Sequence, residues 1–161
     1  MPETLNIEDL VREHPFLKDV DPIIFTTLAG CGHNTEFRAG ELICREGEPA
    51  DHFYLIRSGQ VALETFIPGR GSFIFHSLGP GDCLGLSWLV PPYVWDYDAR
   101  VIETVNALAF DAQCLRHKSD TDPEIGYAFL KQFIPMLVDR LRCARLQALD
   151  LYSMSNDRNV R

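Results

Sequence analysis

The chain has 161 residues, 46% hydrophobic and 24% charged, which is the composition of one ordinary globular domain with a sizeable core. The formal net charge of −8 argues against a nucleic-acid partner, because neutralising phosphates requires a basic face. No apolar run reaches the roughly 18–20 residues that cross a membrane, and residues 1–4 lack the features of a signal peptide. We therefore expect a cytoplasmic protein that binds neither nucleic acid nor membrane.

The reactive side chains show no catalytic or metal-binding pattern. The number of cysteines is odd and no two form a C-x-x-C motif, which predicts free thiols in a reducing compartment. The histidines lack H-x-x-x-H spacing, and neither G-x-S-x-G nor a P-loop lysine motif occurs. Asp82, Asp96 and Asp98 have no partner base, so we assign them to caps and turns. We expect a non-enzymatic protein with no catalytic and no metal-binding residues.

Residues 1–33 form a predicted N-terminal helical segment. Asn6 is a candidate N-cap for a first helix, and His14-Pro15 ends that helix because a residue before proline avoids the α region. Asp21-Pro22 begins a second helix with an N-cap and an N1 proline. Gly30 and Gly32 close this second helix.

From residue 34 to residue 121 the sequence pattern changes, and short apolar stretches alternate with glycine turns. Such close, regular spacing predicts an all-β sandwich or barrel. Ser58-Gly59 is interpreted as a hairpin turn between two of the strands. The expected strands are 35–37, 42–44, 52–57, 61–66, 72–78, 83–84, 99–103 and 106–111.

Residues 122–152 form a predicted long helix that begins at Asp122-Pro123-Glu124. Phe129 and Phe133 widen its apolar stripe before Pro135, which should kink the helix or start a second segment. Beyond Pro135 the stripe narrows to a heptad seam, which favours a parallel homodimer over packing on the chain's own β domain. The predicted dimer interface consists of Leu137, Leu141, Ala144, Ala148 and Leu151.

Two further features of the C-terminal region are expected. Arg140, Arg142 and Arg145 are interpreted as a solvated helix face, because Asp139 and Asp150 flank them. The short polar tail, residues 153–161, should fray.

The stretch from 37 to 61 resembles the cyclic nucleotide-binding domain family, which includes the catabolite activator type of bacterial regulator. The matching residues are Phe37, Gly40, Leu42-Ile43, Gly47-Glu48, Ala50-Asp51, Phe53-Tyr54, Ile56, Ser58-Gly59 and Val61, followed by the turn Leu78-Gly79-Pro80-Gly81-Asp82. The resemblance covers 16–151. It implies a mainly β fold with flanking helices (α+β): a double-stranded β-helix or jelly-roll β-roll, two N-terminal helices and a long C-terminal helix. It also implies cAMP or cGMP as ligand, and no other cofactor is indicated.

The segment after that turn departs from the family pattern, in which a glutamate holds the ribose and an arginine holds the cyclic phosphate. Gly85 and Ala99 match, but Leu86 stands at the glutamate position, Tyr97 at the arginine position and Asp98 at the serine or threonine position. The candidate pocket residues are Gly85, Leu86, Ser87, Trp88, Tyr97, Asp98, Ala99 and Arg100.

Arg100 is the only nearby replacement for the family arginine. On a regular strand it faces away from Tyr97, so it either reaches an anion through a bulge or pairs with Asp98 or Asp96. The aromatic residues Trp88, Tyr93, Trp95 and Tyr97 leave two further interpretations open. They either line a pocket for a flat or apolar ligand or plug the former pocket.

Three functions follow as alternatives. The first is a dimeric, non-enzymatic sensor that signals through an unidentified protein partner, since a helix-turn-helix module would need about 60 residues after Leu151. The second is a structural or adaptor protein with a degenerate, ligand-free pocket. The third is a true cAMP or cGMP receptor that uses Arg100 and the backbone N–H groups of 85–88.

Overall fold

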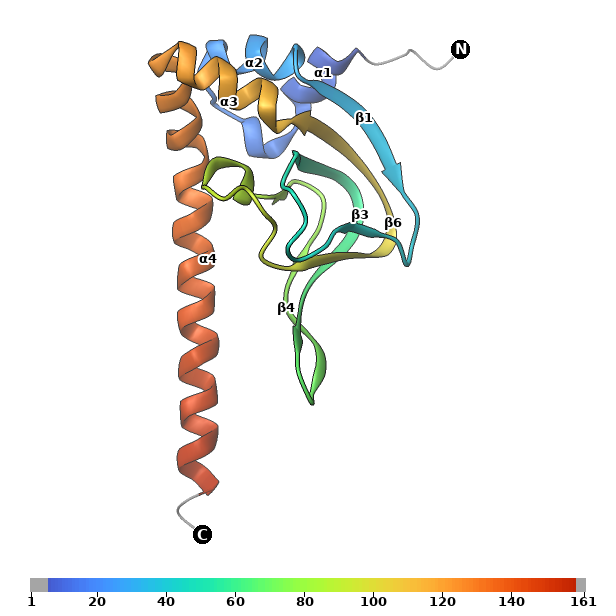
Figure 1. The fold of residues 1–161 in the computed structure, drawn as a ribbon, viewed down its shortest axis with the longest axis vertical. Helices are drawn as coiled ribbons and strands as arrows, with labels where there is room; N and C mark the ends of the chain where they lie inside the picture. Colours follow the sequence, from blue (N-terminus) through green and yellow to red (C-terminus); the bar gives the residue numbers. More distant parts are fainter. Residues whose placement is uncertain (1–5, 159–161) are drawn as a thin grey trace.

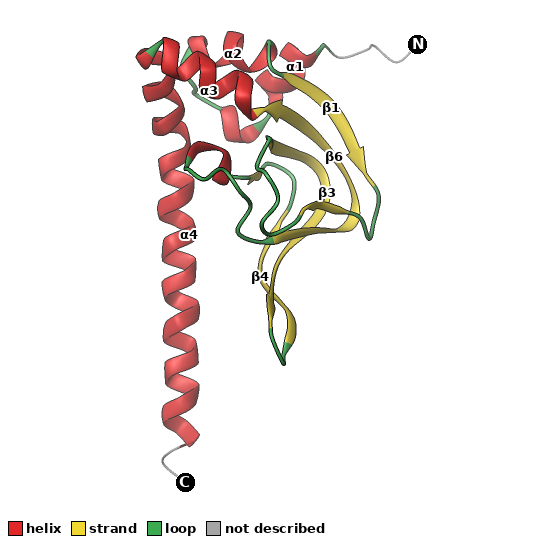
Figure 2. Cartoon of the chain, in the orientation of Figure 1, coloured by secondary structure: helices red, strands yellow, loops and turns green. Residues whose placement is uncertain are grey.

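The computed structural model describes residues 6–158, which form a β-roll flanked by helices (Figures 1 and 2). This arrangement confirms the predicted fold class. In chain order the elements are α1 (Ile7–Glu13), η1 (Pro15–Leu17), α2 (Pro22–Ala29), β1 (Gly32–Phe37), β2 (Leu42–Cys44), β3 (His52–Ile67), β4 (Gly71–Leu78), β5 (Cys83–Leu84), η2 (Ser87–Leu89), β6 (Asp98–Asp111), α3 (Ala112–Thr121) and α4 (Pro123–Arg158).

The roll is one antiparallel sheet built around the two long strands β3 and β6, which pair with each other along most of their length. At one end of this pair β1 joins β6 and β5 joins β3; at the other end β2 joins β6 and β4 joins β3. Because each long strand changes its second neighbour halfway, the sheet curls on itself and encloses a core. Figure 1 shows the resulting curvature.

Gly59 lies inside β3 and forms no hairpin, which corrects the expectation from Ser58-Gly59. The register between β3 and β6 shifts repeatedly between Ile56 and Val61, so the strand bends through a set of bulges. Gly59 has φ +93°, and a Cβ there would collide with the carbonyl of Thr104. The glycine therefore bends a continuous strand, and the predicted strands 99–103 and 106–111 are likewise one strand, β6.

The N-terminal helices begin and end near the predicted positions, but Gly32, which was expected to close the second helix, is the first residue of β1. Helix α1 ends at His14, and the Asp21 side chain caps α2 by accepting from the Ile23 N–H (3.0 Å), whereas Asn6 makes no side-chain cap bond. His14 is buried and bonds Ile56 O through Nε2 (2.8 Å), while its Nδ1 accepts from the Phe16 N–H (3.2 Å). Burial lowers the pKa of His14, and the imidazole is held neutral.

An aromatic cluster joins the roll to α4. Trp88 is fully buried and stacks on Phe53 (ring centroids 5.1 Å apart), and both rings meet Phe133 of α4 edge-on. Phe110 and Phe129 complete the cluster. This contact fixes the beginning of α4 against the roll.

Helix α3, which contains Cys114, was not predicted from the sequence. The pairing of Gly32 with Phe110 brings the ends of β1 and β6 together, so that Cys31 and Cys114 form a disulfide with a Cα–Cα distance of 6.2 Å. The expectation of five free thiols is therefore wrong for this pair. It failed because 83 residues separate two cysteines that only the sheet register makes adjacent.

Helix α4 is one continuous helix with Pro135 inside it, so Pro135 starts no second segment. The helix also continues through Arg158, which corrects the expected frayed tail over 153–158; residues 159–161 lie outside the described residues. Among the helices of residues 6–158, none combines the length and apolar character needed to cross a membrane.

Candidate functional site

The segment that occupies the expected phosphate-binding positions, from Gly85 to Arg100, includes a compact loop anchored inside the protein. The 3₁₀ turn η2 places Trp88 in the core, and Gly85 takes a φ of +115° under the Trp95 ring. A Cβ on Gly85 would lie only 2.8 Å from the Trp95 ring, so the indole covers the site at contact distance. Trp95 is itself 4% exposed.

Backbone hydrogen bonds hold the second half of this loop. The Trp95 N–H donates to Glu48 O (2.9 Å), the Gly47 N–H donates to Trp95 O (2.8 Å), and the Ala50 N–H donates to Tyr93 O (2.7 Å). The guanidinium of Arg116 lies over the Tyr93 ring, 4.3 Å from its centroid. These contacts hold the loop and its aromatic side chains in place.

Two of the predicted polar site residues have partners elsewhere. Asp98 is the first residue of β6 and accepts a hydrogen bond from the Glu46 N–H (2.8 Å), so it is no turn residue, whereas Asp82 accepts from the Gly79 N–H (2.8 Å) within its turn, as expected. Arg100 donates through Nε to Glu64 (3.2 Å), which corrects the expected pairing with Asp98 or Asp96.

The Arg100–Glu64 pair follows from the register of the sheet. Ala62 lies opposite Arg100 and Glu64 lies opposite Asp98, so Arg100 and Glu64 are diagonal neighbours on adjacent strands. The Glu64 side chain is buried, and the arginine therefore balances a buried carboxylate.

Tyr97 faces a cavity of about 290 Å³ between the roll and α4. The roll contributes Leu63, Phe75, His76 and Tyr97; α4 contributes Leu137, Arg140, Leu141, Cys143, Ala144 and Gln147. The Phe75 and Tyr97 rings meet edge-on, 5.8 Å apart. Of the predicted pocket residues, Tyr97 alone lines this cavity within the described part of the chain.

Two polar groups of this cavity distinguish it. The Tyr97 hydroxyl is buried and makes no hydrogen bond within residues 6–158. Burial raises the pKa of Tyr97 to about 12, and the positive charge of the nearby Arg140 guanidinium offsets part of that rise. Arg140 donates through Nη2 to Cys83 O (2.6 Å), so the guanidinium joins α4 to β5. No carboxylate among the described residues lies within ion-pair distance of Arg140.

Sequence reasoning missed Arg140 as a site residue, because its neighbours indicated a solvated face. Asp139 does pair with Arg142 on the outside of the helix (3.6 Å). Arg140 lies one position further, on the side of α4 that faces the roll. The usable signal was helical periodicity, since Phe133, Leu137, Arg140 and Ala144 follow three- and four-residue steps.

The residues of the predicted dimer interface lie on α4 beyond Pro135 and are exposed in the single chain. Leu137, Leu141 and Ala144 also border the cavity, whereas Ala148 and Leu151 lie further along the helix. Leu141 and Leu151 are 66% and 69% exposed. An exposed apolar row of this kind is typical of an interaction surface.

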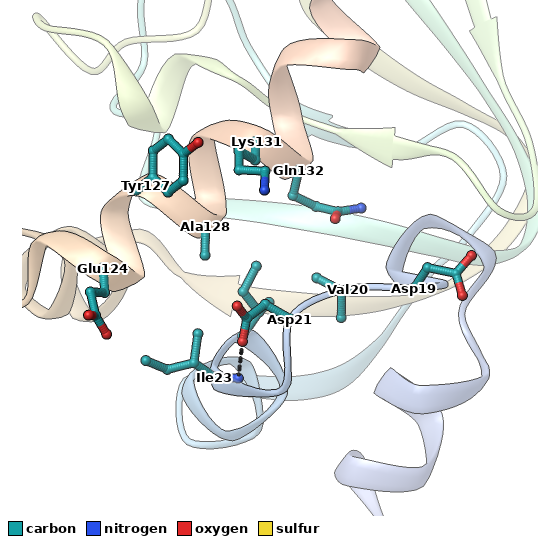
Figure 3. A pocket seen from close by; sticks show the side chains of 10 residues that line it. Asp19, Val20, Asp21, Ile23, Glu124, Tyr127, Ala128, Lys131 and Gln132 are labelled. Carbon is teal, nitrogen blue, oxygen red and sulfur yellow. Dashed lines mark hydrogen bonds between the residues drawn. The ribbon is translucent and has the colours of Figure 1, made fainter.

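A larger cavity of about 520 Å³ lies between α2 with its preceding loop and the first turns of α4 (Figure 3). Its ionisable groups, Asp19, Asp21, Glu124 and Lys131, are exposed, and Asp21 already caps α2, as the dashed line in Figure 3 shows. No buried polar group points into it among the described residues. Nor does the described part of the chain bring together three or more side chains able to hold a metal ion.

Residues 34–122 match the family model of the cyclic nucleotide-binding domain, which is more than half of the chain. The β-roll and its long C-terminal helix agree with that match. The chain therefore belongs to the cyclic nucleotide-binding domain family.

Known proteins extend this assignment. A CRP-like cAMP-activated global transcriptional regulator of Mycobacterium tuberculosis is 26% identical over 145 residues, covering 90% of this chain and 63% of the relative. A cAMP-dependent protein kinase regulatory subunit of Dictyostelium discoideum is 31% identical over 81 residues, covering 48% of this chain and 25% of the relative. By name the first relative is a transcriptional regulator and the second a regulatory subunit, and the chain spans less than two thirds of either.

The fold is also found in a solved structure of a putative cyclic nucleotide-binding protein from Geobacter metallireducens. Its TM-score to this chain is 0.73 at 23% identity, and the match covers 85% of this chain and 99% of that one. The architecture described above is thus that of a known cyclic nucleotide-binding-like β-roll.

Proposed function

We propose that the chain is a dimeric, non-enzymatic regulatory domain that binds a small molecule between its roll and α4 and passes this signal to a protein partner. The observation that carries the proposal is the cavity at that boundary. Six of its lining residues belong to α4, so a bound molecule would contact the helix directly. A molecule that binds one placement of the helix on the roll more tightly than another would shift the population toward that placement.

The exposed row on α4 supports a homodimer. Leu137, Leu141 and Leu151 are half-exposed or more and follow heptad spacing with Ala144 and Ala148. A second α4 laid along this row would bury it. Because Leu137, Leu141 and Ala144 also border the cavity, the ligand and the dimer contact would share side chains.

A protein partner is favoured over DNA by charge. The chain carries a net charge of −8, and Arg140, Arg142 and Arg145 of α4 lie between Asp139 and Asp150. The proposal therefore assigns the output to protein contacts made by α4.

The adaptor function with a ligand-free pocket is the second candidate, and one observation favours it. Trp95 covers Gly85 at contact distance and Trp88 is buried in the core, so the family's phosphate-binding loop is filled by its own side chains. The third alternative, a receptor that holds the phosphate through Arg100, loses its support because Arg100 neutralises buried Glu64.

Thermal unfolding with and without cAMP and cGMP, each at about 1 mM, tests whether either nucleotide is the bound molecule. A ligand that binds only the native state at a hundredfold excess over its Kd adds about 2.7 kcal/mol, which raises Tm by roughly 5–10 °C at this size. A nucleotide-dependent rise in a dimer supports the sensor. A chain that is strictly monomeric at about 10 µM contradicts it, since a helix dimer that signals must form near that concentration.

A further inference from the structure

The walls of the cavity between the roll and α4 are almost entirely apolar. Leu63 and Phe75 close it from the roll, and Leu137, Leu141 and Ala144 close it from α4. Walls of this kind accept a compact hydrophobic body and offer no partners to a molecule with many polar groups. The ribose and base of a nucleotide would leave several hydrogen-bonding groups unsatisfied here.

The polar side of the same cavity consists of few groups. The Tyr97 hydroxyl is buried without a hydrogen-bond partner in residues 6–158. Gln147 already donates through Nε2 to Phe75 O (3.0 Å). His76 and Cys143 complete the polar lining. A phenol without a partner is costly to bury, and a ligand acceptor at this point would remove that cost.

Arg140 supplies the only positive charge of the lining. Its guanidinium has five N–H donors, and Cys83 O accepts from Nη2 alone. Because no carboxylate of the described residues pairs with it, its charge is free to meet an anion. A planar carboxylate fits the remaining fork of donors and can also accept from the phenol.

We infer that this cavity takes a small monocarboxylic acid with an apolar body, held by Arg140 and Tyr97, in place of a cyclic nucleotide. The inference rests on the proposed function, because it names the ligand of the same site. One guanidinium matches one negative charge, and a volume of about 290 Å³ limits the apolar part to a ring system or a short chain.

Cys143 provides a built-in reporter of occupancy. It lines the cavity and is partly exposed, whereas Cys44 and Cys83 are buried and burial raises the pKa of each to about 12. Cys31 and Cys114 are joined to each other. Alkylation by iodoacetamide, followed by mass spectrometry, therefore reads Cys143 selectively, and Cys143→Ser confirms the assignment.

The test compares indole-3-acetate with its uncharged amide on the full chain. At a hundredfold excess over its Kd, the acid should slow alkylation of Cys143 about a hundredfold, because about 1% of the sites remain open. The amide should have little effect. This comparison of the acid with the amide needs only the wild-type chain, so its result does not depend on whether any variant folds.

Variants then locate the contacts. Arg140→Gln should weaken protection by the acid about 10- to 100-fold, and Tyr97→Phe should weaken it less, because a charged hydrogen bond is stronger than a neutral one. Arg145→Gln, on the exposed face of the same helix, should leave protection unchanged.

Three results would overturn the inference. Equal protection by acid and amide would remove the role of Arg140. Protection by cAMP or cGMP but not by indole-3-acetate would reject the ligand class while leaving the proposed function in place. No protection by any of these molecules at about 10 mM would reject the inference and favour the ligand-free adaptor over the sensor.

Discussion

The two halves of α4 have opposite relations to the rest of the molecule. Before Pro135, Phe129 and Phe133 are 1% and 3% exposed and pack into the aromatic cluster around Trp88. After Pro135, Leu141 and Leu151 are more than 60% exposed. The first half contributes side chains to the core, whereas the second half runs beside the roll and ends beyond it, as Figure 1 shows.

This difference separates a segment of α4 that stabilises the fold from a segment to which the proposed function assigns signalling. The second half contacts the roll through side-chain hydrogen bonds from Arg140 to Cys83 O and from Gln147 to Phe75 O, with a cavity between the two elements. A segment that is held by few contacts of this kind is only weakly stabilised. A ligand or a second chain can therefore shift the second half without unfolding the first.

The largest expected effect concerns the first half. Phe133→Ala should lower the free energy of unfolding by about 3–5 kcal/mol, because it leaves a cavity among Phe16, Phe53 and Trp88. The matched change Leu149→Ala on the exposed second half should cost less than about 1 kcal/mol in the monomer. Urea denaturation measures both. Equal costs would mean that the two halves are packed alike.

The next effect concerns the proposed dimer. Leu141→Asp places a charge in the row that would pair with a second α4 and should raise the dimer Kd at least about 100-fold. Leu146→Asp makes the same change on the opposite side of the helix and should leave the Kd nearly unchanged. Sedimentation equilibrium gives both values, and an equal response of the two variants would show that this row is not the interface.

A smaller effect depends on pH and again acts on the first half. His14 positions Phe16, whose ring packs on Phe133 (centroids 5.4 Å apart) and whose carbonyl accepts from Gln132. Burial lowers the pKa of His14 below its ordinary value of 6.5, so the unfolded chain binds the proton more readily. This contribution to stability is complete above pH 6.5 and is lost as the pH falls toward the lower, folded pKa, by up to about 1.4 kcal/mol per pH unit.

His14→Gln removes that dependence. We expect the variant to be less stable at pH 7.5 and its free energy of unfolding to fall less steeply between pH 6.5 and 5 than that of the wild type. Denaturation curves over this range provide the comparison. Parallel slopes in the two proteins would show that His14 is not held neutral by the fold.

The smallest effect concerns the docking of the second half. Gln147→Ala removes the exposed hydrogen bond to Phe75 O and should cost about 0.5 kcal/mol. Gln113→Ala, on the exposed face of α3, serves as the control. A cost near 3 kcal/mol for Gln147→Ala would mean that the second half is an integral part of the fold.

Much of this fold was predictable because local signals determine it. Asp21-Pro22 begins α2 as expected, and the glycine turns separate strands that the roll contains. The hairpin expected at Ser58-Gly59 was wrong because the sequence does not reveal whether a glycine turns a strand or bends it; the carbonyl of Thr104 decides this. The disulfide between Cys31 and Cys114 likewise depends on a register that no local pattern encodes.

The candidate site was predictable only in part. From the sequence, the resemblance predicts that Tyr97 and Leu86 stand where the family has its arginine and glutamate, and this stays a prediction. The partner of Arg100 was not predictable, because Glu64 is distant along the chain and becomes a neighbour through the pairing of β3 with β6. Arg140 was missed for a related reason, since only the docking of α4 gives its guanidinium a place beside Tyr97.

Hydrogen exchange along α4, measured at high and low protein concentration, tests the central claim most directly. The amides around Phe129 and Phe133 should be protected equally at both concentrations, because packing within one chain protects them. The amides from 137 to 151 should be protected at high concentration and exchange faster on dilution, as the proposed dimer dissociates. Protection of the second half that does not change on dilution would contradict the account.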